Sequence, residues 1–367
     1  MRGNTVNLLL PNSVYGHMAL RSASTRPVGI AASYYGPRLS RFLAETVSYV
    51  FLLRKAIPAA FRAHVILSHH HPSRLAVFCA AVTSVVSHRP MVARADDIVA
   101  GKPRGARENI AGFVLRVCIK WSLKKAQLVL VNGDELVEVI QRMYRLSKDV
   151  VGVSRNGVDT ERFSPKRRSE DLRAGIGSRH ILVFSGALYA NRGVDVLLNA
   201  VPLLRERVAD LKVLILGDGP ELTRLLHLAR NLHIADTANF LGTVNPDLVP
   251  DYLASSDVGI GPLRASSVTV GTYPLKVLEY MASGCVVVSV KDALSRRLIV
   301  HSQTGLVTES SDPRELAETI QAALSDKETS RRVSDNARAL VERSYSWDAV
   351  VTKLETILRS AVENSSG

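Results

Sequence analysis

The sequence is poor in several features that would place it outside the ordinary globular proteins. Its 367 residues include only three cysteines, Cys79, Cys118 and Cys285, which lie in apolar surroundings and lack the spacing of a metal site. No uncharged apolar run approaches the ~20 residues of a membrane-spanning helix, and the first residues show no secretory signal pattern. We therefore expect a cytoplasmic protein with reduced cysteines.

Aromatic residues are also scarce, at 5% of the chain, and the basic residues are not interleaved with them. This composition disfavours nucleic acid as a partner, because single-stranded nucleic acid is held largely by stacking on aromatic rings. Hydrophobic content of 46% and charged content of 22% indicate a globular chain that can bury sizeable cores. The length suits two domains better than one.

The net charge of +13 is distributed unevenly along the chain. Residues 1–165 hold 23 Lys+Arg and 10 Asp+Glu, whereas the remainder holds 24 of each, so the whole excess lies in the first part. Such asymmetry predicts an anionic partner for that part, and with nucleic acid disfavoured we expect an anionic membrane surface. The protein would then be peripheral at the inner face of the cell membrane. A basic domain without such a partner is the alternative.

One predicted helix, over residues 107–125, concentrates this charge. Arg116, Lys120 and Lys124 recur every four residues, as on one face of a helix, which could dock on anionic lipid. We expect a second face to be apolar, formed by Ile110, Val114, Val117, Cys118 and Trp121. A core-facing helix with a solvated basic face is the alternative interpretation.

Strands and helices alternate in both halves of the chain. This pattern predicts an α/β fold of two doubly wound, parallel-sheet (Rossmann-like) domains facing each other across a cleft. We expect one domain over residues 1–165 and a second over residues 166–345. The C-terminal helix, within residues 346–367, is expected to pack back on the first domain.

The most informative stretch is 269–290, which predicts a loop, a short helix, a glycine stop and a buried strand. Thr272 is the best candidate for the helix N-cap. Lys276 follows in the first turn, where the helix dipole disfavours a cation, and a bound phosphate would remove that conflict. Glu279 shares its face and could accept hydrogen bonds from a neighbouring sugar hydroxyl. A solvated Lys–Glu pair on a surface helix is the alternative.

Glycines mark two further strand-to-helix turns. Gly217 and Gly219 occupy one, although Leu222 stands where the dinucleotide fingerprint needs its third glycine. A second turn of the same kind runs from Gly186 to Arg192, and Arg192 repeats the placement of a cation where the dipole favours an anion. We interpret Arg192 and Lys276 as two clamps on one diphosphate.

Acidic and histidine residues follow two predicted strands of the first half. Asp96 and Asp97 come at the carboxyl end of a strand, where α/β sheets bind ligands, so they are candidates for acceptor or sugar contacts. The run His69–His71 is expected to be a loop, because neighbouring side chains point to different sides and cannot converge on one metal. We expect no metal site.

These residues together resemble the GT-B fold glycosyltransferases of family four, the retaining group that includes bacterial polysaccharide and lipid-linked sugar transferases. The resemblance covers residues 128–358. It is carried in order and spacing by the segments 154–159 (Ser-Arg-Asn-Gly-Val-Asp), 186–195, 217–220 (Gly-Asp-Gly-Pro), 240–242 (Phe-Leu-Gly), 254–258 (Ala-Ser-Ser-Asp-Val) and 274–284, with Phe163 and Pro165.

The resemblance implies a donor that is a nucleotide-diphosphate sugar, held mainly by the second domain. Glu279 matches the residue that holds the ribose hydroxyls, Arg192 the one that binds the diphosphate, and Lys276 belongs to the Pro-x-Lys-x-x-Glu-Tyr subgroup. Gly242 and Thr243 would lie near the base. Together with Gly186, Gly217, Gly219 and Thr272, these are the expected donor-binding residues.

The expected chemistry is transfer of the sugar to a saccharide or lipid-linked acceptor in cell-surface polysaccharide or glycolipid synthesis. Arg192 and Lys276 would stabilise the negative charge left on the diphosphate, so that no metal or other cofactor is required. Asp97 is the third expected catalytic residue. Closure of the two domains would exclude water.

The sequence departs from the family pattern at three places. Gly271 stands where many members carry a sugar-contacting glutamate, and Ala187 stands where many carry an arginine. No glycine-rich loop is evident in the first 40 residues, so the N-terminus is expected to be short or divergent. Two alternatives therefore stay open: a sugar-nucleotide epimerase of the same fold, and a non-catalytic relative that only binds nucleotide.

Overall fold

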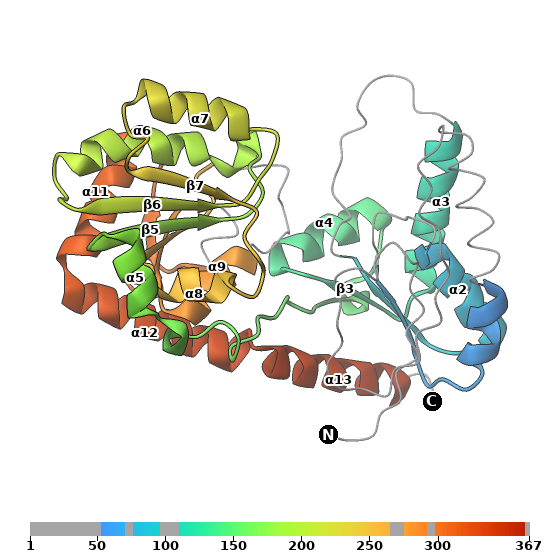
Figure 1. Cartoon of the computed structure of the whole chain (residues 1–367). Helices are drawn as coiled ribbons and strands as arrows, with labels where there is room; N and C mark the ends of the chain where they lie inside the picture. The colour runs from blue at the N-terminus through green and yellow to red at the C-terminus, as the bar shows by residue number, and fades with distance from the viewer. Residues whose placement is uncertain (1–52, 70–75, 96–109, 265–274, 292–297, 364–367) are drawn as a thin grey trace. The chain divides into compact units, whose positions relative to one another are not determined.

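The structure is a computed structural model that describes residues 53–69, 76–95, 110–264, 275–291 and 298–363. The chain divides into two compact units (Figure 1). Unit 1 comprises Met1–Val153 with Glu355–Gly367, and unit 2 comprises Ser154–Leu354. The predicted boundary after residue 165 lies inside unit 2.

Unit 1 is a parallel α/β unit. Residues 53–60 are helical. The elements that follow are β1 (Ile66–His69), α2 (Ala76–Ser87), β2 (Met91–Arg94), α3 (Ile110–Lys125), β3 (Leu128–Val131), α4 (Asp134–Tyr144), the 3₁₀ helix η2 (Lys148–Val150) and β4 (Val151–Val153). The strands form one sheet in the order β1-β2-β3-β4, with every neighbouring pair parallel. Apolar side chains of β2 and β3 form its core with α2, α3 and α4.

Helix α3 presents to the core a different face from the one predicted. Ile119, Ser122 and Leu123 are buried, whereas Val117 and Trp121 are 51% and 37% exposed. The prediction was wrong because the helix carries two apolar stripes, and periodicity alone does not tell which of them packs against the sheet. No helix in the described ranges is long and apolar enough to cross a membrane.

Unit 2 is the larger α/β unit. Its elements are η3 (Pro165–Arg167), α5 (Glu170–Ile176), β5 (His180–Ser185), η4 (Ala190–Arg192), α6 (Val194–Arg205), β6 (Leu211–Leu216), α7 (Leu222–Asn231), β7 (Ala238–Gly242), α8 (Val249–Ala254), β8 (Val258–Ile260), α9 (Leu275–Ser283), β9 (Val286–Val290), β10 (Leu306–Thr308), α11 (Pro313–Ser325) and α12 (Lys327–Ser344). The last helix, α13 (Trp347–Glu363), begins in unit 2 and ends in unit 1.

The six strands that the structure describes in unit 2 are all parallel, in the order β10-β9-β8-β5-β6-β7. The chain runs outward from β5 through β6 to β7, then returns to the other side of β5 with β8. The order therefore reverses between β5 and β8, and the crevice at the carboxyl ends of these two strands is the position at which open α/β sheets bind ligands.

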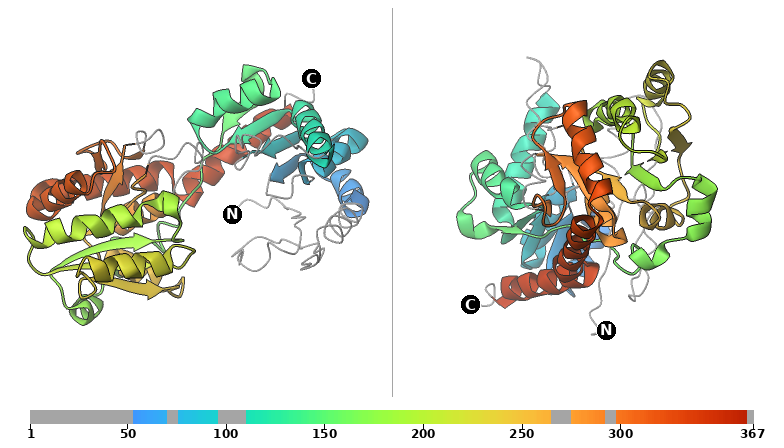
Figure 2. Two further views of the ribbon diagram at one scale, coloured as in Figure 1. Left: turned by 90° about the horizontal axis from the view of Figure 1, so that it is seen from above. Right: turned by 90° about the vertical axis from the view of Figure 1, so that its left-hand side faces the viewer.

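Each face of this sheet packs on its own set of helices (Figures 1 and 2). Alternate residues of one face contact α6, α7 and α11, and those of the other face contact α8, α9 and α12. The run Val286–Val290 is buried at every position because a parallel strand covered on both faces has no solvated side. The packing of these layers fixes the position of α9 on one face of the sheet, next to its carboxyl edge.

The segment 154–165 belongs to unit 2 because it is bonded to the end of α12 and the start of α13. The Val158 amide donates to the Tyr345 carbonyl at 2.8 Å, and the Trp347 amide donates to the Val158 carbonyl at 3.2 Å. Phe163 is buried in the same cluster as α9. These are contacts between residues far apart in the sequence.

Candidate functional site

The candidate site lies at the carboxyl edge of the unit 2 sheet, beside the reversal between β5 and β8. Loop 186–193 follows β5, and α9 follows β8. One hydrogen bond joins them directly: the Ser185 amide donates to the hydroxyl of Tyr280, a side chain with no exposed surface. The predicted residues Gly186, Arg192, Lys276 and Glu279 are therefore carried by two adjoining segments.

The ammonium group of Lys276 lies against Gly186. Gly186 has φ +139°, and a Cβ at this position would overlap Lys276 Nζ. The same nitrogen lies 4.8 Å from the centroid of the Phe184 ring, within the range of a cation–π contact. Glycine at 186 is thus required twice, for its backbone conformation and for the room that the lysine occupies.

Lys276 is a partly buried cation beside a second cation. Its pKa is lowered from 10.5 to about 8, chiefly by burial and also by the nearby charge of Arg192, while the charge of Glu279 acts in the opposite direction. Its ammonium group has no hydrogen bond or ion pair with the described part of the chain. Two neighbouring positive charges, only partly balanced by Glu279, favour an anion as the ligand of this site.

Among the described residues, the hydrogen bonds that hold Arg192 come from its backbone. Its amide donates to the Tyr189 carbonyl at 2.9 Å, and its carbonyl accepts from the Leu263 amide at 3.2 Å. Its Nε is buried and has no hydrogen-bond partner among the described residues. A buried unpaired donor costs about 1–3 kcal/mol, and an anionic ligand bound beside Lys276 would remove that cost.

Glu279 lies one turn after Lys276 on α9, also largely buried. Burial raises the pKa of its carboxyl, and the charges of Lys276 and Arg162 lower it. No hydrogen bond to the carboxylate comes from the residues that the structure describes, so its oxygens are available to accept from a ligand hydroxyl. The predicted ribose contact remains a prediction that agrees with this arrangement.

Arg162 is a residue of the site that sequence reasoning missed. It comes from the segment before the first strand of unit 2, and its guanidinium donates to the Pro246 carbonyl at 2.7 Å and to Asp247 at 3.2 Å. Neither periodicity nor spacing relates it to Glu279. The only sequence signal is its place three residues after Asp159 in a segment that resembles the family.

Three of the predicted glycines bring loops of the edge together. A Cβ at Gly217 would overlap the Gly186 carbonyl oxygen, and one at Gly219 would come within 2.6 Å of the Leu188 carbonyl oxygen. The Gly217 amide also donates to the Gly242 carbonyl at 2.7 Å. The close approach of three loops therefore explains these glycines without a ligand. Gly242 faces open space and the next residue, Thr243, is exposed, which leaves both accessible to a ligand.

Two predicted site residues, Asp97 and Thr272, lie outside the described residues, as do Asp96 and Gly271. The predictions made for them stay untested. Across the described ranges, no group of three or more His, Cys, Asp or Glu side chains is arranged to hold a metal ion. Of the three cysteines, Cys79 and Cys285 are buried free thiols.

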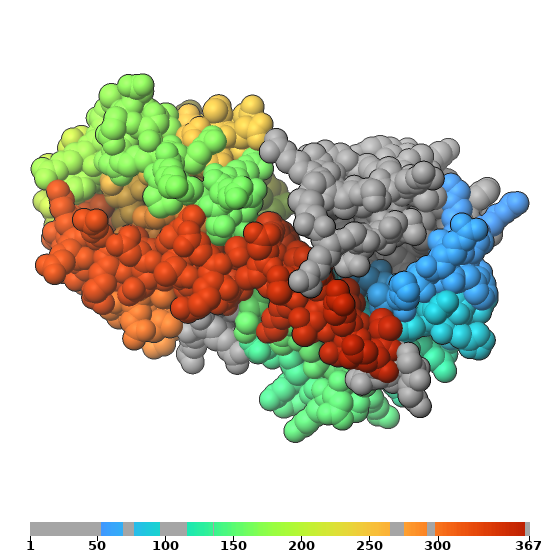
Figure 3. Space-filling model, turned by 90° about the horizontal axis from the view of Figure 1, so that it is seen from below, coloured from blue at the N-terminus to red at the C-terminus, as the bar shows by residue number. Residues whose placement is uncertain are grey.

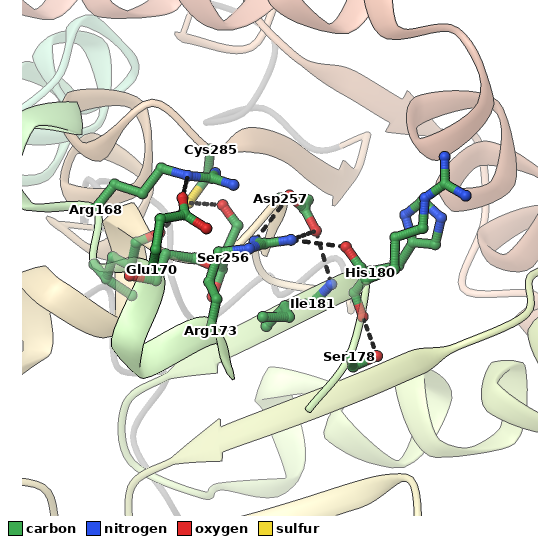
Figure 4. A network of polar contacts seen from close by, with 12 residues as sticks. Arg168, Glu170, Arg173, Ser178, His180, Ile181, Ser256, Asp257 and Cys285 are labelled. Atoms are coloured by element: carbon green, nitrogen blue, oxygen red, sulfur yellow. Dashed lines mark hydrogen bonds and ion pairs between the residues drawn. The ribbon is translucent and has the colours of Figure 1, made fainter. Parts of the chain in front are cut away.

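A second polar cluster lies at the opposite, amino edge of the sheet (Figure 4). Asp257 accepts from the Ile181 amide at 2.8 Å and from Arg173 at 3.1 Å, and Arg173 also donates to the Ser255 carbonyl at 2.7 Å. This network joins α5 to the starts of β5 and β8. The Asp257 segment, which contributed to the family resemblance, thus has a structural role distant from the ligand edge.

Comparison with known proteins matches the family model of the glycosyl transferases group 1 over residues 169–340. The chain is 30% identical over 208 residues to the GDP-mannose-dependent alpha-(1-6)-phosphatidylinositol monomannoside mannosyltransferase of Mycobacterium tuberculosis, over 55% of this chain and 54% of that protein. It is 28% identical to the D-inositol 3-phosphate glycosyltransferase of Corynebacterium glutamicum, over 68% of this chain and 61% of that protein. The chain thus spans about half to six tenths of these relatives' length.

Among solved structures, HepE of Anabaena in complex with UDP has a TM-score of 0.71 at 18% identity, over 91% of this chain and 86% of that chain. At 18% sequence identity this similarity shows a shared fold alone. It agrees with the two parallel-sheet α/β units described above, which were predicted from the alternation of strands and helices.

Proposed function

Because residues 169–340 match the family model of the glycosyl transferases group 1, we propose that the chain is a retaining glycosyltransferase. It would move a sugar from a nucleotide-diphosphate sugar to a saccharide or lipid-linked acceptor. One observation carries the proposal: Lys276 and Arg192 are neighbouring cations whose side chains form no hydrogen bond or ion pair with the described residues, at the carboxyl edge where the strand order reverses.

The chemistry follows from the charge that develops on the donor. The bond between the anomeric carbon and the diphosphate oxygen breaks, and its electron pair stays on the diphosphate. The acceptor oxygen bonds to the anomeric carbon, and its proton passes to an oxygen of the departing diphosphate. Lys276 and Arg192 stabilise the departing diphosphate without needing a metal ion, because both charges are already placed at the edge. Glu279 holds the ribose, and retention means that the acceptor enters from the face that the diphosphate leaves.

The nature of the acceptor is proposed from the relatives and from unit 1. The mycobacterial relative is named for a phosphatidylinositol mannoside acceptor and the corynebacterial one for inositol 3-phosphate. In this chain, Val117 and Trp121 are exposed on α3 beside Arg116, Lys120 and Lys124. An exposed apolar pair flanked by cations suits the interface of an anionic membrane, where a lipid-linked acceptor is presented at the cytoplasmic face.

Donor turnover tests the proposal. Purified protein is incubated with a panel of UDP-, GDP- and ADP-sugars, and release of nucleoside diphosphate and binding of each donor are measured. We expect at least one donor to be bound and turned over, and K276A and E279A each to lose this activity. E318A is the matched control, because Glu318 is exposed on α11 away from the edge. A panel with neither turnover nor binding would contradict the proposal.

The same panel separates the two alternatives. An epimerase would convert a nucleotide sugar into its epimer without an acceptor, which product analysis detects. A non-catalytic relative would bind a nucleotide through Lys276 and Glu279 but release no sugar from any donor in the presence of lipid extract.

A further inference from the structure

Arg338, on helix α12, joins two segments that carry residues of the candidate site. Its guanidinium donates to the carbonyl oxygens of Phe163 at 2.6 Å and Thr160 at 2.9 Å, and to that of Ala282. Ala282 lies near the end of α9, and Thr160 and Phe163 lie on either side of Arg162 in the sequence. We propose that Arg338 is a positioning residue for the donor site, acting through α9 and through loop 160–163.

The first connection sets the position of α9. The last carbonyls of a helix have no partner within it, and the Arg338 guanidinium supplies one for Ala282, with a favourable charge at the negative end of the dipole. Beside it, Ala337 and Val341 of α12 pack in the cluster that contains Leu278 and Met281. Glu279 lies one turn before Ala282, so a shift or fraying of this end of α9 moves the carboxylate.

The second connection sets the position of Arg162. Because Arg338 holds the carbonyls on both sides of it, the backbone of Arg162 cannot turn away without breaking these bonds. The Arg162 side chain then reaches Pro246 and Asp247, and its charge acts on the Glu279 carboxyl. One guanidinium thus fixes a carboxylate and the cation that faces it, from two segments far apart in the sequence.

Only arginine has the geometry for this role. Its fork carries five N–H donors in one plane, of which Nη1 and Nη2 reach the three carbonyls while Nε donates to Glu342 at 2.6 Å. The side chain is 18% exposed, so the bonds are largely shielded from water. A lysine has three donors on a single nitrogen and cannot span the same carbonyls. R338K therefore keeps the charge but loses the bridge.

Hydrogen exchange tests positioning in the unliganded protein. In R338K we expect faster amide exchange, by several-fold or more, confined to peptides that cover 159–163 and 275–284, with α11 unchanged. The control is R331K, because Arg331 lies on the same helix but is 86% exposed. Its ion pair with Asp335 is long, at 3.9 Å, and lies in solvent. Figure 3 shows this helix, in orange-red, at the surface of unit 2. Unchanged exchange, or a uniform increase over unit 2, would overturn the proposal.

Nucleotide binding tests the consequence for the site, and this arm rests on the proposed function. With UDP and GDP as probes, at a temperature where both proteins are fully folded, R338K should raise the Kd of the nucleotide that binds by about tenfold, or ~1.4 kcal/mol. In an E279A background the same change should raise it by less than about twofold, because Arg338 acts through Glu279. An equal effect in both backgrounds contradicts positioning. If the unaltered protein binds neither probe, the donor proposal fails for UDP- and GDP-sugars, and the exchange result alone decides for or against Arg338.

Discussion

The Tyr280 hydroxyl accepts a hydrogen bond from the Ser185 amide at 2.7 Å and so ties helix α9 to the end of strand β5. The tyrosine is fully buried, and burial raises the pKa of its hydroxyl far above its ordinary value. The bond therefore involves the neutral hydroxyl and persists over the whole working pH range. It places Lys276 and Glu279, which share α9 with Tyr280, against the loop that carries Gly186.

Removing this hydroxyl should lower both the stability of the protein and its affinity for the nucleotide. In Y280F the Ser185 amide is left without its acceptor in a largely buried place, which we expect to lower the free energy of unfolding by about 1–3 kcal/mol. Urea denaturation measures this loss. Y252F is the control: Tyr252 is partly buried on α8, and its hydroxyl bonds to no described residue. Equal losses in the two variants would contradict the role given to the bond.

A methyl group at position 186 should displace the lysine. In G186A the new Cβ overlaps Lys276 Nζ at a backbone φ of +139°, so we expect the Kd for the bound nucleoside diphosphate to rise by tenfold or more, about 1.4 kcal/mol. Calorimetry at equal protein concentrations measures it.

The same substitution at Gly175 is the control for G186A. Gly175 is exposed within α5, and a Cβ there meets no atom within 4 Å. G175A should leave nucleotide affinity unchanged and should stabilise the protein by roughly 0.5–1 kcal/mol, because alanine loses less backbone entropy in a helix. Unchanged affinity in G186A would show that Lys276 does not hold the nucleotide.

Nucleotide affinity should fall as pH rises above about 8. Burial and the charge of Arg192 lower the Lys276 pKa from 10.5 to about 8, so the unliganded folded protein loses this proton early. A bound diphosphate favours the charged lysine and raises its pKa again, so binding above pH 8 must take up a proton. The Kd should therefore rise by up to about tenfold per pH unit above pH 8. Titration calorimetry in two buffers of different ionisation enthalpy measures the uptake.

The free energy of unfolding should change with pH in the opposite direction to the nucleotide affinity. Between pH 8 and 10.5 the unfolded chain binds more protons at Lys276 than the folded one, so this group raises the free energy of unfolding as pH increases through that window. K276R provides the contrast, since arginine stays charged, and its nucleotide affinity should show no corresponding loss above pH 8. A loss of the same size in K276R would assign the pH dependence to another group.

Helix α3 should hold the protein on anionic vesicles. Replacing Arg116, Lys120 and Lys124 by glutamate should abolish co-sedimentation with phosphatidylglycerol vesicles, because each basic residue near such a surface contributes about 1 kcal/mol. W121A should weaken binding without changing its dependence on salt, since the indole contributes apolar contact and no charge.

A charge-matched control lies on α12, where three arginines are exposed. Replacing them by glutamate changes the net charge by the same amount and should leave vesicle binding in place if α3 is the docking surface; they are Arg331, Arg332 and Arg343. Binding that falls equally in both triple variants would reduce the effect to net charge alone.

Several features of this protein follow from the order of residues alone. Alternation of apolar runs with amphipathic segments predicts parallel α/β units, because such strands need helices on both faces. The placement of Lys276 in the first turn of α9 predicts an anion, because the dipole conflict is local to that turn. Sequence also predicts that Gly186 and Arg192 share the edge with Lys276, since parallel strands end together.

Other features depend on contacts between distant segments, which no local pattern encodes. The apolar stripe of α3 that packs on the sheet differs from the expected one, because two apolar stripes compete and only the sheet selects one. Arg162 and Arg338 join the site through carbonyls of loops 160–163 and 245–247 and of α9, whose meeting is set by the layers of unit 2. The sequence by itself determined which groups could bind a diphosphate. The tertiary structure decided which residues hold those groups in place, because backbone carbonyls carry no sequence signal and become partners only when the chain is folded.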